Sequence, residues 1–95
     1  MINELLKIIR AIYGMNQAEA SEALGISKSY LSEIESGKKK VTLNILDKYH
    51  EAYGISPSAI LFFSEKYKSK SIEYMRKKMA SFFLNTLAEM TADEK

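Results

Sequence analysis

Apolar residues recur along most of this chain at the three- and four-residue spacing of an α-helix. The first run consists of Leu5, Leu6, Ile9, Ile12 and Tyr13. We expect Asn3 to be the N-cap of this helix and Gly14 to end it. A second run covers residues 17–24. Asn16 directly precedes it and Glu19 follows three residues later, which is the spacing of a capping box. Gly25 follows at a position where the left-handed backbone conformation costs glycine least. The pattern therefore predicts two helices, the second of them short.

Three further helices are expected over residues 28–36, 43–53 and 58–63. They are preceded by Ser27, Thr42 and Ser56, each of which has the short polar side chain of a helix N-cap. Pro57 then stands in the first turn of the last of the three, where proline is well tolerated. The apolar face of the middle helix consists of Leu43, Leu46, Tyr49 and Tyr53.

The C-terminal third begins with a polar stretch over residues 64–70 and continues into a last helix over about residues 71–90. That helix has a wide apolar stripe, formed by Ile72, Met75, Met79, Phe82, Phe83, Leu87 and Met90. We find no internal repeat and no strand pattern. The predicted fold is all-α, with a five-helix unit in residues 1–65 and a C-terminal helix in residues 66–95.

Length and composition describe one small domain with an added element. The chain has 95 residues, 46% hydrophobic and 27% charged, which is ordinary for a globular protein. There is no cysteine, so disulfides and thiolate metal sites are excluded. No apolar run is long enough to span a membrane, and the first residues do not resemble a signal peptide. We therefore expect a cytoplasmic protein with no membrane partner.

The charges are unevenly distributed along the chain. Residues 1–64 hold seven basic and seven acidic residues, whereas residues 65–95 hold seven basic and five acidic residues. The formal net charge of +2 thus comes entirely from the C-terminal part. A chain with this balance can bind a polyanion only through the placement of its charges and not through their excess.

Residues 16–38 have the pattern of two short helices joined by a turn that contains glycine. Gly25 supplies the turn, and Ser21 is small enough for the second helix to pass close by. Ile26, Leu31 and Ile34 are expected to point inward. The opposite face of the second helix is polar and consists of Lys28, Ser29, Ser32 and Glu33. A helix with such a face can enter the major groove of DNA.

Over about residues 3–64 the order of predicted helices, N-caps and glycines resembles that of the lambda-repressor-like DNA-binding domains of the Cro/cI and Xre families. The resemblance implies that residues 28–36 form the recognition helix. It also implies that Arg10 and Glu35 form a partly buried ion pair that ties two helices together. Gln17 stands where the family has a glutamine that bonds a phosphate and braces the recognition helix.

Contacts with DNA divide into those that read bases and those that hold phosphates. We assign base contacts to Lys28, Ser29, Ser32 and Glu33, since lysine donates to guanine and glutamate accepts from cytosine. Phosphate contacts are assigned to Asn16, Gln17, Tyr30, Lys38, Lys39, Lys40 and Asn44. The alternatives are a solvated helix face for the first group, simple capping for Asn16, a lid over the core for Tyr30 and a mobile charged loop for the three lysines.

Nothing in the sequence indicates catalysis. The acidic residues are scattered, and no facing pair is available for acid–base chemistry. His50, the one histidine, is expected on an exposed helix face. We therefore expect no catalytic residue, no metal site and no cofactor.

The C-terminal stripe predicts an interface. A palindromic DNA site is read by a two-fold protein, so we expect the stripe to form a homodimer. Two alternatives are that the stripe folds back onto the five-helix unit, or that it binds an unlike protein. The sequence therefore predicts a homodimeric transcriptional regulator, repressor-like, that reads a palindromic operator in double-stranded DNA. The alternative function is an antitoxin-like protein whose last helix binds a partner and whose DNA binding is autoregulatory.

Overall fold

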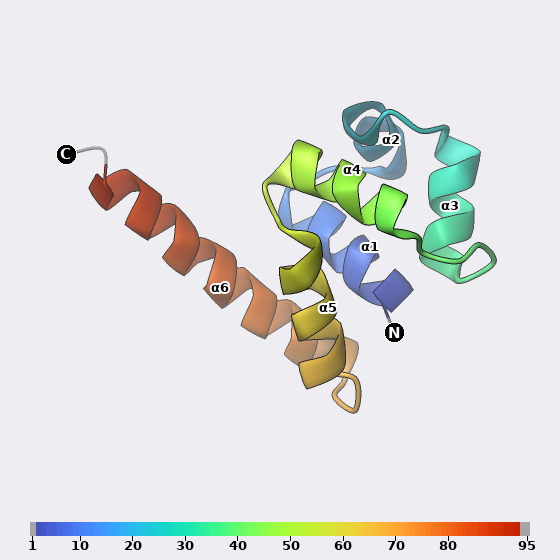
Figure 1. Cartoon of the computed structure of the whole chain (residues 1–95). Coiled ribbons are helices and arrows are strands. Elements are labelled where there is room, and N and C mark those ends of the chain that lie inside the picture. Colours follow the sequence, from blue (N-terminus) through green and yellow to red (C-terminus); the bar gives the residue numbers. More distant parts are fainter. Residues whose placement is uncertain (1, 94–95) are drawn as a thin grey trace.

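Six helices and no strand make up the part of the chain that the structure describes. This structure is a computed structural model, which describes the backbone of residues 2–93 and the side chains of residues 2–82. The helices are α1 (Ile2–Ile12), α2 (Gln17–Leu24), α3 (Lys28–Ser36), α4 (Leu43–Tyr53), α5 (Pro57–Lys66) and α6 (Ile72–Asp93). Figure 1 shows α2 and α3 on one side of α1 and α4, and α5 and α6 on the other. Over the described residues no helix combines the length and the apolarity that crossing a lipid bilayer requires.

Polar side chains fix where four of these helices begin. Asn16, Ser27, Thr42 and Ser56 each accept a hydrogen bond from a backbone N–H in the first turn of the helix that follows. At Asn16 the capping box is complete, because Glu19 also accepts from the Asn16 backbone N–H. Each cap satisfies a backbone donor that the helix itself leaves unpaired. These four predicted N-caps are confirmed. The fifth, Asn3, is wrong as a cap, because α1 begins at Ile2 and Asn3 lies within its first turn.

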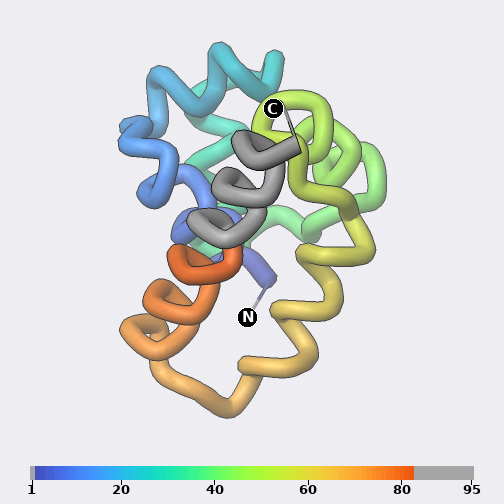
Figure 2. The backbone as a smooth tube through the Cα atoms, turned by 90° about the vertical axis from the view of Figure 1, so that its left-hand side faces the viewer, coloured from blue at the N-terminus to red at the C-terminus, as the bar shows by residue number. Residues whose placement is uncertain are grey.

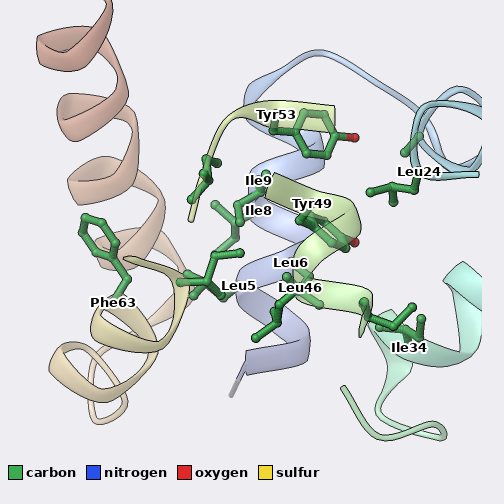
Figure 3. Packing of buried hydrophobic residues seen from close by; sticks show 14 of the residues in the cluster. Leu5, Leu6, Ile8, Ile9, Leu24, Ile34, Leu46, Tyr49, Tyr53 and Phe63 are labelled. Carbon is green, nitrogen blue, oxygen red and sulfur yellow. The ribbon is translucent and has the colours of Figure 1, made fainter. Parts of the chain in front are cut away.

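The core lies around α1. Leu5, Leu6, Ile8 and Ile9 of this helix are all buried. Figure 3 shows them surrounded by buried side chains of the other helices, among them Leu24, Ile34, Leu46, Tyr49, Tyr53 and Phe63. Because α1 contacts α3, α5 and α6, the helix on which DNA recognition is expected and the C-terminal helix pack against the same central element.

The first part of α6 belongs to this core. After the turn that follows α5, α6 runs back beside α1 (Figure 2). Met75 is 0% exposed and Met79 is 1% exposed, so both side chains are buried in the core that α6 shares with the five-helix unit. This corrects the expectation for these two residues, which are packed in the core and not presented to a partner. Ile72 and Phe82 remain exposed.

Phe83, Leu87 and Met90, the rest of the expected interface, lie outside the residues whose side chains the structure describes.

Two further details differ from expectation. Leu43 was expected on the apolar face of its helix, but it is 68% exposed because it stands in the first turn of α4, beyond the edge of the core. The fifth helix continues to Lys66 and does not end at residue 63. Phe63 and Tyr67 stack with ring centroids 5.8 Å apart, and this contact favours the extra turn of α5.

Three tyrosines meet where α1 and α4 pack. The Tyr13 and Tyr53 rings are 4.8 Å apart, and the Tyr49 and Tyr53 rings are 5.7 Å apart. Tyr53 donates a hydrogen bond from its hydroxyl to the Met15 sulfur, and Tyr13 donates to the Tyr53 carbonyl oxygen. The Tyr49 hydroxyl is buried and has no hydrogen-bond partner among the described residues. Burial raises the pKa of Tyr49 and that of Tyr53.

Candidate nucleic-acid interface

The turn between α2 and α3 sets the angle between the two helices. Gly25 has φ +72°, in the left-handed region that side chains other than glycine rarely adopt. Its N–H donates to the Glu22 carbonyl, and the N–H of Ile26 donates to the Ser21 carbonyl at 3.0 Å. Ser21 is buried and bonds the Ala18 carbonyl within its own helix, so it offers the small surface that close packing requires. The glycine predicted for the turn is therefore where the backbone needs it.

The two faces of α3 lie in different environments. Leu31 and Ile34 are completely buried in the core. Lys28, Ser29 and Ser32 are exposed, and Glu33 is half-buried. One side of α3 is thus held by apolar contacts, while the other presents hydrogen-bonding groups to solvent.

A shallow depression gathers the residues that were expected to read bases. It has a volume of about 450 Å³ and is lined by Gln17, Lys28, Ser29, Ser32 and Glu33. The four candidate base contacts of α3 therefore lie together, with Gln17 of α2 at their edge. Lysine donates, glutamate accepts and the two serines do both, so the surface can match a mixed pattern of base edges.

Behind this surface, Glu35 links three helices. The Arg10 guanidinium makes two parallel bonds to the carboxylate: Nε to Oε2 at 2.7 Å, and Nη2 to Oε1 at 2.9 Å. Gln17 donates from Nε2 to the same Oε1 at 3.1 Å. The ion pair that the resemblance implies is present, and the side chains of Arg10 and Glu35 are 13% and 3% exposed. The hydrogen bond to Glu35 raises the pKa of Arg10 above its ordinary value.

Asn3 adds a contact that the sequence pattern did not predict. Its Nδ2 donates to the Glu35 backbone carbonyl at 3.2 Å, near the end of α3. Asn3 stands seven residues before Arg10 and so lies on the same face of α1. This spacing is the only feature of the sequence that could have indicated the contact. Through Asn3 and Arg10, α1 holds the end of α3 with two polar side chains.

The expected phosphate contacts come from several elements. Lys38, Lys39 and Lys40 are exposed directly after α3, and a bond from the Lys39 N–H to the Glu33 carbonyl anchors their loop. Asn44 is exposed in the first turn of α4. Asn16 is exposed, and its side-chain oxygen already caps α2.

Tyr30 and Gln17 differ from the other phosphate candidates. Tyr30 is half-buried and packs against the core, as the lid alternative requires. Gln17 was expected both to brace the recognition helix and to bond a phosphate. Its amide donates a hydrogen bond to Glu35 of α3, which corresponds to the first of these two roles. Within the described residues there is no group of three or more potential metal ligands.

Comparison with known proteins agrees with this geometry. A family model for helix-turn-helix domains of the Cro/cI type matches residues 6–60, more than half of the chain. The matched range contains α2, α3 and α4 whole and most of α1. Searches of curated proteins and of solved structures give no match.

Proposed function

Because the chain belongs to the Cro/cI-type helix-turn-helix family, we propose that it is a sequence-specific regulator of transcription that binds double-stranded DNA. The observation that carries this proposal is the outer face of α3. Its exposed side chains line one shallow depression, while the opposite face is fixed by the core and by the Glu35 contacts. A rigid helix with free hydrogen-bonding groups is what entry into the major groove requires.

In this proposal the side chains have different tasks. Lys28, Ser29, Ser32 and Glu33 contact base edges in the major groove. Lys38, Lys39, Lys40, Asn16, Gln17, Tyr30 and Asn44 hold the sugar-phosphate backbone. Gln17 can serve both DNA and protein, because an amide nitrogen has two donor hydrogens and the structure uses one of them for Glu35.

We further propose that the protein acts as a homodimer and represses transcription from a palindromic operator. The nine residues of α3 present only a few side chains to DNA, so one copy reads a short half-site. Two copies related by two-fold symmetry would read half-sites whose centres are about 34 Å apart, one turn of B-DNA.

Selection from random duplexes tests this function. The purified chain is mixed with a pool of random 30-base-pair DNA at moderate salt, and the bound fraction is sequenced. We expect an enriched inverted repeat with half-sites about ten base pairs apart. A pool that is retained without enrichment, or that is not retained at all, would contradict sequence-specific binding.

A second candidate function is an antitoxin-like protein with autoregulatory DNA binding. One observation favours it, namely the exposed aromatic and basic side chains on α5 and α6. It predicts that an unlike protein co-purifies with the chain in a fixed ratio, which mass spectrometry of the purified material would detect.

A further inference from the structure

Aromatic and basic side chains gather where α5 and α6 meet. The rings form one continuous cluster with centroids 4.9–5.8 Å apart: Phe62, Phe63, Tyr67, Tyr74 and Phe82. Over these rings lie the ammonium groups of Lys66, Lys70 and Lys78, at 5.3–5.6 Å from ring centroids. We call these eight residues the basic aromatic surface. The helices that carry it, α5 and α6, lie on the opposite side of α1 and α4 from α3 (Figure 1).

This surface is open and partly hollow. Phe62 is 58% exposed and Phe82 is 40% exposed, although aromatic side chains usually contribute most when buried. A hollow of about 270 Å³ lies between the two, with Lys66 and Lys78 at its edge. Its size suits one large apolar side chain, and its edge suits a carboxylate beside it.

The positive charge of the surface is not balanced locally. Residues 65–82 contain six basic and two acidic residues. Glu65 pairs with Lys68 at 2.9 Å, and Glu73 lies 3.6 Å from Arg76. Neither acid therefore pairs with a lysine that lies over a ring. A ligand for this surface has to combine negative charge with apolar side chains.

The same chain contains a segment of that chemistry. Residues 83–95 include three acidic residues, Glu89, Asp93 and Glu94, against one lysine. Their apolar residues Phe83, Leu87 and Met90 share one helical face by spacing. The side chains of this segment lie outside those that the structure describes.

We propose that the basic aromatic surface of one copy binds residues 83–95 of a second copy, and that the second copy returns the contact. Within one chain, α6 rises by about 1.5 Å per residue, so the backbone of Glu89 and that of Asp93 lie about 16 Å or more along the helix axis from Lys78. Contact between two copies of the surface itself would bring lysines against lysines, which is unfavourable. Reciprocal contacts make the pair of α6 helices antiparallel and related by a two-fold axis.

This inference rests on the homodimer of the proposed function and names the surfaces that form it. Charge exchange tests it in the full-length chain. The first variant is Lys66→Glu with Lys78→Glu, and the second is Glu89→Lys with Asp93→Lys. Dimerisation is measured by sedimentation equilibrium from nanomolar to micromolar concentration. The matched control, Lys7→Glu with Lys48→Glu, changes the net charge as much as the first variant does, at positions on α1 and α4 that do not belong to the basic aromatic surface.

We expect the wild type and the control to form dimers of similar affinity. Each charge-reversed variant should dimerise about a hundredfold more weakly, because every ion pair occurs twice across the two-fold axis. An equimolar mixture of the two variants should form a heterodimer, since both reciprocal contacts are again between opposite charges. Circular dichroism of each variant verifies that the helices are retained.

Three results would overturn the inference: a monomeric wild type, a dimer that neither variant weakens, or a mixture that forms no heterodimer. None of the substitutions lies in α2 or α3. The proposed function is therefore tested by a separate measurement, the enrichment of duplex DNA. Enrichment by a wild type that stays monomeric would leave DNA recognition standing and reject the dimer contact. A wild type that dimerises as expected but enriches no sequence would reject DNA recognition alone.

Discussion

The hydroxyl of Tyr49 is a polar group in an apolar core, without a hydrogen-bond partner among the described residues. We expect Tyr49→Phe to raise the free energy of unfolding by about 1 kcal/mol, because a buried unpaired hydroxyl costs about 1–3 kcal/mol and the ring itself is kept. Urea denaturation measures the change. Tyr53→Phe is the control and should lower stability, since its hydroxyl bonds the Met15 sulfur. If Tyr49→Phe is destabilising, the hydroxyl has a partner such as a bound water.

The same two tyrosines predict a loss of stability in alkaline solution. Burial raises the pKa of Tyr49 and Tyr53 above the ordinary value of 10.0, so the unfolded chain loses these protons first. Above pH 10 the folded state binds more protons than the unfolded state, and the free energy of unfolding falls as the pH rises. Denaturation midpoints between pH 8 and 11 should show this fall, and Tyr49→Phe should make it shallower. An unchanged slope in the variant would assign the fall to other groups.

Lys28 and Lys38 should affect DNA binding in different ways. Lys28 lines the depression on α3, whereas Lys38 follows the helix in the loop. We expect Lys28→Ala to change which bases are preferred and to cost about 1–3 kcal/mol on the selected site. Lys38→Ala should weaken all sequences alike and reduce the slope of log affinity against log salt by about one unit. Fluorescence anisotropy on matched and mismatched duplexes separates the two, and equal losses everywhere from both variants would reject the division of roles.

At the scale of the element, Glu35 connects α1, α2 and α3 through Arg10 and Gln17. We expect Glu35→Gln to lower the free energy of unfolding by about 3 kcal/mol, because it leaves the Arg10 charge partly buried without its counter-charge. DNA affinity should fall as well, although Glu35 itself does not face the depression. Thermal denaturation and duplex binding measure both effects. Glu22→Gln on the exposed side of α2 is the matched control. A Glu35→Gln protein as stable as this control would show that the Arg10–Glu35 ion pair does not stabilise the packing of the three helices.

The helices themselves were largely predictable, because their ends are local features. Asn16, Ser27 and Thr42 cap helices with their own side chains, and Gly25 adopts the one backbone conformation that suits the turn. Leu43 was not predictable, because helical spacing shows which residues share a face but not how far that face extends over the core.

Across the whole molecule, α6 shares one hydrophobic core with the five-helix unit, since Met75 and Met79 are buried against it. Met75→Ala should therefore lower the free energy of unfolding by about 2–5 kcal/mol, as other large-to-small changes in cores do. Unfolding should remain a single transition for the whole chain. Ile72→Ala, at an exposed position of the same helix, is the control and should change little. A Met75→Ala protein as stable as wild type would show that α6 is not packed on the core in solution.

The partner of an apolar stripe could not be read from its sequence. Ile72, Met75 and Met79 share a spacing that suits a second copy as well as it suits the chain's own α1, and only the three-dimensional packing distinguishes the two. The candidate base contacts were more predictable, because the face that remains after Leu31 and Ile34 enter the core has to point outward. Asn3 was missed because its bond joins residues far apart in the chain.

The separate attachment of α3 has a consequence for protein engineering. Its buried residues and Glu35 secure the helix, while Lys28, Ser29 and Ser32 take no part in that attachment. New side chains at these three positions should therefore leave the melting temperature almost unchanged while they redirect the protein to other target sequences. A library randomised at these codons alone would supply orthogonal switches for synthetic gene circuits, all carried by one unchanged scaffold.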